Sequence, residues 1–461
     1  MPLVWELTEV LRPRILRDKL RAFNESWKRQ GGGQSDVVVD DLAQVATRLD
    51  MHYENILGYI ETQYRRPGPL QQEYHYFYGW VADLVYHLLL FRHVHEEPYL
   101  ASTLPFMSGI KQFATENAPL WVFSLNHDII VECLAAAHGI PLSSGFGPEA
   151  VTLPRHDALG VKIGTVRAEI ISGEDLDRLN TRFLPHGTFG VNLLKIHGAL
   201  DVFAFHEGRD FMKLLPEAQT PAGLIAALRV ANEELRWVHP QTKRQAKATN
   251  EIAYADDNGA MQFLRRTLLA GAFKFDDRRP QVLSKKFLEV FRFNINCVSK
   301  LVCIGYGFGD AHINDVIRGW LELTQDRQLE IVTPGPVKLP PSLMHLAPQI
   351  FIVDAKATDY LDRIAGITRS RGERVQKRLA AWSRRKSGDE FRAEFQAFQQ
   401  SFIADKMKEF SDRLEAARNN SVSAPPRDEQ SNTAEVRRIA GEVWGTAEDL
   451  LEAFLNTRDS K

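Results

Sequence analysis

The chain contains few cysteines and no long apolar run, and both absences exclude classes of protein. Cys133, Cys297 and Cys303 include no C-x-x-C pair, so they fit neither a disulfide framework nor a thiolate zinc site. We expect them to be reduced, buried thiols. No stretch reaches the ~18 consecutive apolar residues of a membrane helix, and the N-terminus does not resemble a signal peptide. The sequence therefore predicts a cytoplasmic protein that makes no membrane contact.

The sequence also lacks an excess of charge of either sign. Lys and Arg number 57 against 59 Asp and Glu, which leaves a net charge of −2. Such a balance provides no general attraction to nucleic acid, so we expect no direct nucleic-acid binding. With 461 residues, the chain is too long for one typical domain. It predicts a large core domain with appended elements.

Hydrophobic patterning divides the chain into a core that contains a sheet and several helical additions. Residues 6–116 and 205–290 are predicted to be largely helical. Short apolar runs alternate with helices within 119–204 and 295–360, a pattern typical of buried parallel strands. The predicted fold class is therefore α/β: a Rossmann-like parallel sheet with helical insertions in a domain of residues 1–368, followed by C-terminal helices. The apolar runs are 120–125, 192–196, 300–305, 329–333 and 350–354.

The sheet pattern stops near residue 368, and three further segments follow. Residues 369–417 predict an amphipathic helical region, 418–435 a linker rich in Asn, Ser and Pro, and 436–457 a C-terminal helix. An apolar stripe marks the first of these segments. Its members are Phe391, Phe395, Phe398, Phe402, Met407, Phe410 and Leu414. The stripe is either the buried face of a helix within this chain or a surface for docking or self-association.

Polar residues follow three of the apolar runs, where an open α/β sheet binds its ligands. They form the segments 124–128 (Ser-Leu-Asn-His-Asp), 195–201 (Lys-Ile-His-Gly-Ala-Leu-Asp) and 305–314 (Gly-Tyr-Gly-Phe-Gly-Asp-Ala-His-Ile-Asn). Each segment alone has a structural explanation. Asn and Asp commonly cap helices, a histidine beside glycine can be a satisfied core residue, and glycines mark ordinary turns.

Taken together and in this order, the three segments resemble the sirtuin family. The similarity is greatest to the branch found in microbial defence proteins, whose motifs approximate T-N-x-D, L-H-G-S-x-D and I-G-Y-S-F-x-D-x-H-I-N. The resemblance implies an NAD-binding domain over roughly residues 1–360, in which Asn126 and His197 are catalytic. It also implies a set of residues that contact NAD: Ser124, Asp128, Gly305, Gly307, Phe308, Asp310, His312 and Asn314.

Several departures from the family pattern refine this expectation. His127 stands where this branch often has an aromatic residue, and Ala199 stands where it usually has serine. The glycine-alanine-glycine loop that opens a sirtuin domain is absent, although residues 1–7 resemble those that come just after it. We therefore expect the chain to start late, without one strand and one phosphate-binding turn. The four paired cysteines of protein-deacylating sirtuins are also absent, which favours the branch that cleaves NAD.

The resemblance implies hydrolysis of the nicotinamide–ribose bond of NAD, giving nicotinamide and ADP-ribose. We assign His197 as general base, because the ordinary pKa of histidine is near neutrality. Asn126 would orient the water or the ribose, and Asp128 would hold the local geometry or the nicotinamide amide. This chemistry requires no metal, so no metal ligand is assigned.

In this branch of the family, loss of NAD serves as an antiphage response, by abortive infection. The resemblance therefore implies a homo-oligomer, or a complex with a HerA-type ATPase or another defence subunit. Two alternatives stay open. One is a non-catalytic NAD-binding or scaffold subunit of a defence complex, and the other is an NAD-dependent protein deacylase.

Overall fold

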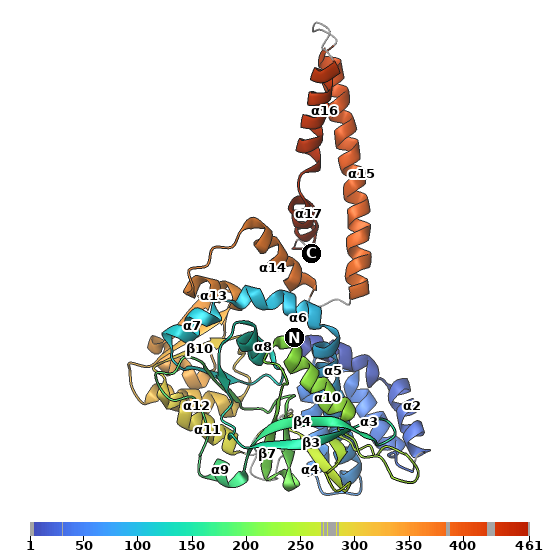
Figure 1. The fold of residues 1–461 in the computed structure, drawn as a ribbon, viewed down its shortest axis with the longest axis vertical. Coiled ribbons are helices and arrows are strands. Elements are labelled where there is room, and N and C mark those ends of the chain that lie inside the picture. Colours follow the sequence, from blue (N-terminus) through green and yellow to red (C-terminus); the bar gives the residue numbers. More distant parts are fainter. Residues whose placement is uncertain are drawn as a thin grey trace. The chain divides into compact units, whose positions relative to one another are not determined.

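The computed structural model describes residues 4–29, 31–268, 271, 274, 283, 285–383, 388–421 and 429–459. The chain forms two compact units, Met1–Ile367 and Thr368–Lys461 (Figure 1). The first unit combines helices with parallel and antiparallel strands. The predicted α/β fold class is therefore confirmed, whereas the Rossmann-like arrangement stays a prediction. Most of segment 1–7 forms the first helix, and residues 1–3 lie outside the described residues.

The N-terminal part of the first unit is built from helices. In α5, the side chains of Phe77, Val81, Val85 and Leu88 are buried at intervals of three and four residues, which places them on one face of the helix. Within the described residues, no helix is long and apolar enough to cross a bilayer. The helices are α1 (Val4–Leu11), α2 (Arg17–Lys28), α3 (Asp36–Ala46), α4 (Tyr53–Arg65), α5 (Gln71–His95), α6 (Glu97–Thr103) and α7 (Ile110–Glu116).

Two small parallel sheets contain the strands that the apolar runs predict. One has the order β1-β5-β2, from β1 (Leu120–Ser124), β5 (Val191–Lys195) and β2 (Leu142–Ser143). The other has the order β10-β11-β12, from β10 (Lys300–Ile304), β11 (Gln328–Thr333) and β12 (Ile350–Asp354). Helices follow these strands along the chain: α8 (Ile130–Ala137) after β1, α12 (Ala311–Glu322) after β10 and α13 (Ala357–Ile364) after β12.

An antiparallel sheet that the sequence analysis does not predict has the order β3-β4-β7-β6-β9-β8. The prediction that residues 205–290 are largely helical is wrong, because much of this sheet lies there. The strands within 205–290 have only five or six residues, too few to show a periodicity that distinguishes them from helix. The strands are β3 (Ala150–His156), β4 (Lys162–Ile171), β6 (Val202–Phe205), β7 (Asp210–Leu215), β8 (Glu251–Ala255) and β9 (Met261–Arg266). Helices α9 (Gly173–Asp177), α10 (Pro221–Glu234) and α11 (Lys286–Asn294) lie between or after them.

The second unit consists of helices, with boundaries that differ from the predicted ones. They are α14 (Arg371–Ser383), α15 (Gly388–Ser421), α16 (Glu429–Trp444) and α17 (Ala447–Asp459). The described ends of the predicted linker are helical, so the linker of residues 418–435 is wrong there, and 422–428 lie outside the described residues. The predicted single helix over 436–457 is also wrong. Gly445 has a φ of 63°, which ends α16, and Thr446 begins α17 by exchanging hydrogen bonds with Asp449.

The apolar stripe of α15 is partly buried inside the second unit. The ring centroids of Phe395 and Phe398 lie 5.3 and 5.2 Å from that of Phe454 on α17. Further along α15, Ile403 is 43% exposed and Met407 is 57% exposed. The first part of the stripe is therefore intramolecular core, whereas Met407 in its later part, and Ile403 one turn before it, are exposed. The side chain of Phe391 lies outside the described residues.

The three cysteines differ in environment. Cys133 is buried and Cys303 is half-buried, and burial raises the pKa of each thiol to about 12. Cys297 is exposed, so the prediction that all three are buried is wrong for this residue. It lies in the short 3-10 turn Ile295–Cys297, which carries the chain over the surface into β10.

Candidate functional site

The three polar segments come together at the carboxyl ends of their strands. Ser124 at the end of β1 is the register partner of Lys195 at the end of β5. Beyond the strands, the N–H of Leu200 donates to the carbonyl of His127 at 2.8 Å. The third segment joins them through its histidine, because Nε2 of His312 lies 3.0 Å from Nε2 of His197. Residues almost 200 positions apart in the chain therefore border one site.

The histidine pair lies at the centre of this site. His197 is buried, and His312 is half-buried in the first turn of α12. Burial, assisted by the ammonium group of Lys274, holds the pKa of His197 well below its ordinary value. Burial also lowers the pKa of His312 to about 4, against the opposing charge of Asp310. Both imidazoles are therefore neutral at neutral pH, and the Nε2 of one can donate to the Nε2 of the other.

Lys274 is a site residue that the sequence analysis misses. Its Nζ lies 3.1 Å from a carboxylate oxygen of Asp310 and 3.1 Å from one of Glu54 on α4, and its side chain is only 6% exposed. Asp310 therefore forms an ion pair and does not cap α12 with its side chain. No pattern marks Lys274 in the sequence, because it is a single lysine between β9 and α11, in a region predicted to be helical.

The residues of the first segment differ in what they offer to a ligand. Asn126 is exposed, and its backbone N–H donates to Oγ of Ser124 at 3.2 Å. Asp128 is buried, and its carboxylate accepts the N–H of Ile130 at 3.0 Å where α8 begins. Asp128 thus has a structural role, because it satisfies a backbone N–H at the start of α8, although the N-cap residue of this helix is Ile129. Asn126 is the member of the pair that a ligand can reach.

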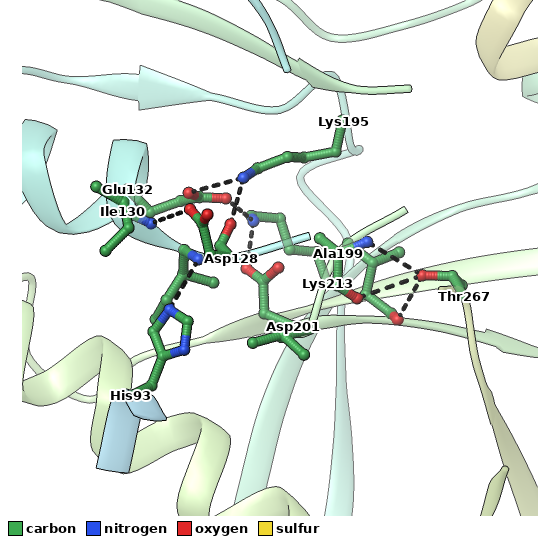
Figure 2. Close-up of polar contacts among 12 residues, drawn as sticks. His93, Asp128, Ile130, Glu132, Lys195, Ala199, Asp201, Lys213 and Thr267 are labelled. Carbon is green, nitrogen blue, oxygen red and sulfur yellow. Dashed lines mark hydrogen bonds and ion pairs between the residues drawn. The ribbon is translucent and has the colours of Figure 1, made fainter. Parts of the chain in front are cut away.

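A buried network of four charged side chains links the first two segments (Figure 2). Nζ of Lys195 lies 3.5 Å from the Glu132 carboxylate and donates to the backbone carbonyls of Asn126, at 3.3 Å, and of Asp128. Lys213 pairs with Glu132 at 3.3 Å and with Asp201. Burial alone would lower the pKa of Lys213, but the two carboxylates outweigh it and raise that pKa.

The network contains two cations and two anions, all less than a tenth exposed. Lys195 and Asp201 belong to the second polar segment, whereas Glu132 lies on α8 and Lys213 on β7. Through the hydrogen bonds of Lys195, the network fixes the backbone of the Asn126 segment. The sequence analysis misses Glu132 and Lys213, because charged residues such as Glu and Lys are usually exposed, and nothing in the sequence marks these two as buried.

Gly198, which follows His197, is required by a close backbone approach. Its φ is +83°, and a Cβ atom there would lie 2.0 Å from the carbonyl oxygen of Thr267. Thr267 is fully buried after β9, and its hydroxyl donates to the carbonyl of Val202 at 2.9 Å. Figure 2 also shows the hydrogen bonds between Thr267 and Ala199. The antiparallel sheet thus holds the histidine loop in place.

The third segment contains both bracing and open positions. Asn314 is buried, accepts a hydrogen bond from the Tyr306 hydroxyl at 2.9 Å and donates to the carbonyl of Phe308 at 2.9 Å. Phe308 is also buried and has a φ of 56°, a conformation rare for a residue with a side chain. A Cβ at Gly305 or Gly307 would meet no atom within 4 Å, so the loop surface there is open. Asn314 and Phe308 therefore shape the loop that Gly305 and Gly307 present.

His197, Asp310 and His312 also form the kind of cluster that can hold a metal ion. One potential ligand atom from each residue lies within 4.8 Å of the other two. Chemically, then, the site offers a neutral histidine pair, a carboxylate, a buried ammonium group and an exposed amide. Comparison of the chain with protein-family models and with curated proteins gives no match.

Proposed function

We propose that the first unit hydrolyses NAD at the nicotinamide–ribose bond. The observation that carries the proposal is the contact between His197 and His312 where the three polar segments converge. The reaction forms one bond, between a water oxygen and the ribose carbon, and breaks the bond from that carbon to nicotinamide. One proton of the water must leave, so the site needs a group that accepts it.

His197 accepts this proton in our proposal, with His312 as its hydrogen-bond partner. The pKa of His197 is lowered from the near-neutral value on which its assignment as general base in the sequence relied. A base with a low pKa is always unprotonated at neutral pH but accepts a proton weakly. The neighbouring imidazole compensates, because it can share the proton across the 3.0 Å contact.

The other residues then have distinct roles. The exposed amide of Asn126 orients the water or the ribose. The open surface at Gly305 and Gly307 admits the nucleotide, because backbone without side chains allows close approach. We assign Asp128, Phe308 and Asn314 to shaping these two loops, and Ser124 to supporting Asn126. NAD is the substrate in this scheme, and every group that acts belongs to the chain.

Substitution of the two proposed catalytic residues tests the function. His197→Gln and Asn126→Ala should each reduce NAD turnover by about 100-fold or more, the usual effect of removing a base or an orienting group. The matched controls are His206→Gln, an exposed histidine paired with Asp210 at 2.7 Å, and Asn180→Ala, an exposed asparagine. Turnover is measured by chromatography of nicotinamide. Site variants whose turnover stays within a few-fold of wild type would contradict these residue roles, and a wild type that releases no nicotinamide would favour a non-catalytic NAD-binding subunit.

The biological role proposed is antiphage defence by NAD depletion, through self-association or a HerA-type ATPase partner. The exposed Ile403 and Met407 on α15 are the observation that favours self-association. If that surface joins copies of the chain, Ile403→Glu with Met407→Glu lowers the particle mass measured by light scattering. An unchanged mass would leave a separate partner as the remaining way of covering the surface.

A further inference from the structure

The ligand set at the centre of the site is the one that transition metals bind. Imidazole nitrogen and carboxylate oxygen are both zinc ligands, and Zn²⁺ with three protein ligands keeps an open position. Ligand atoms about 2.0–2.2 Å from a tetrahedral ion lie roughly 3.3 Å from one another. The Nε2 atoms of His197 and His312 are 3.0 Å apart, close to that spacing. A carboxylate oxygen of Asp310 lies within 4.8 Å of a ring nitrogen of each histidine, near enough to become the third ligand if its side chain turns from Lys274 toward the ion.

We propose that His197, Asp310 and His312 bind one divalent transition-metal ion, for which Zn²⁺ is the test ligand. Binding requires that the Nε2 lone pairs of both histidines face the ion, so both imidazoles must carry their proton on Nδ1. The imidazole that donates from Nε2 in the metal-free pair therefore changes tautomer when the ion enters.

The surrounding charges favour a cation at this position. Lys274 opposes the ion, but Glu54 and Asp310 together contribute two negative charges against its single positive charge. Arg292 and Asp315, the other charged groups that influence His312, cancel each other. The group as a whole carries a net charge of −1 before the ion binds.

The consequence for activity rests on the function proposed above, whereas metal binding itself does not. An ion on Nε2 of His197 occupies the lone pair that would accept or share the proton. Zn²⁺ therefore inhibits NAD hydrolysis instead of supporting it, and the same three residues switch between a base and a metal site. Metal availability then sets the fraction of active enzyme.

The binding test uses the full chain without a histidine tag, freed of metal by dialysis against EDTA and kept without NAD. Calorimetric titration with Zn²⁺, and the absorption spectrum with Co²⁺, should show one ion per chain. His312→Gln or His197→Gln should weaken binding by about 100-fold, since each removes one of three protein ligands. His345→Gln is the matched control, because this exposed histidine also lies beside a carboxylate, that of Glu322 at 3.1 Å, and it should bind as wild type does.

Asp310→Asn provides a second ligand variant if a histidine variant proves unfolded by circular dichroism. The absence of saturable binding by the wild type, or unchanged binding in a folded ligand variant, would overturn the metal site. In a separate arm, Zn²⁺ should stop NAD turnover by the wild type, and EDTA should restore it. A chain that binds Zn²⁺ at these residues but never cleaves NAD would refute the proposed function and support the metal site.

Discussion

Lys195→Met should destabilise the first unit by removing one charge from the buried network. Met has a similar length, so the change leaves the volume almost filled and removes mainly the ammonium group. The side chains of Lys195 and Glu132 are only 5% and 3% exposed. Without Lys195, the network keeps two carboxylates and the single cation of Lys213, so one buried negative charge is uncompensated. Breaking such a pair costs about 3–5 kcal/mol in the free energy of unfolding.

The double variant Lys195→Met with Glu132→Gln separates charge balance from packing. It leaves one cation, Lys213, and one anion, Asp201, which remain paired. We expect it to be more stable than the single variant by about 2 kcal/mol, because it leaves no buried charge uncompensated. NAD turnover should not recover with stability, because Met cannot donate to the carbonyls of Asn126 and Asp128.

Urea denaturation followed by fluorescence measures these differences. With a slope of about 3 kcal/mol per molar urea, the single variant should unfold at a concentration roughly 1–1.7 M lower than the wild type. Arg178→Met serves as control, because Arg178 and Glu174 form a pair in which both side chains are at least 70% exposed, and such a change shifts stability by no more than about 0.5 kcal/mol. An unchanged midpoint for Lys195→Met, or a double variant whose loss equals the sum of the two single losses, would refute this reasoning.

Two further predictions concern Gly198 and His127, which lie beside each other in the site. In urea denaturation, Gly198→Ala should destabilise the protein more than Gly305→Ala does. Both glycines have a positive φ, but only a Cβ at 198 would overlap the Thr267 carbonyl. Equal losses of stability would show that this contact is unimportant. Burial lowers the pKa of His127 from 6.5 to about 4. Between these pH values the unfolded chain takes up a proton that the folded chain does not. The free energy of unfolding should therefore fall by about 3 kcal/mol as the pH drops from 6.5 to 4. His127→Asn should lose this part of the pH dependence, and an unaltered pH profile in that variant would argue against it.

The strands of the parallel sheets could be predicted because their sequences are continuous apolar runs. Leu120–Ser124 and Lys300–Ile304 consist largely of such residues, and both are strands. The antiparallel sheet could not be predicted in the same way. In β9, Phe263 is exposed and Arg266 is buried, which reverses the usual relation between hydropathy and burial. The burial of Arg266 depends on an ion pair with Asp83, far away in the sequence, and no local pattern contains that information.

The residues of the candidate site likewise fall into those that a sequence pattern predicts and those that it does not. The rule that ligands bind at the carboxyl ends of parallel strands predicted which segments lie at this edge, and the structure brings those of His197 and His312 into contact. The rule does not say which residues of a segment face a ligand. Asp128 and Asn314 were candidates for contact with NAD, yet their hydrogen bonds hold a helix start and a loop. Lys274 reaches the site through tertiary packing alone, so only the folded chain reveals it.

The central claim is that the first unit cleaves NAD with water as the acceptor, and the most direct test is product analysis in water enriched in a heavy oxygen isotope. The full chain, freed of metal, is incubated with NAD. The products are separated, and their masses are measured by mass spectrometry. The account predicts nicotinamide and an ADP-ribose that carries one heavy oxygen, with both products reduced by about 100-fold or more in His197→Gln. Release of nicotinamide without heavy oxygen in ADP-ribose, or equal release by wild type and His197→Gln, would contradict it.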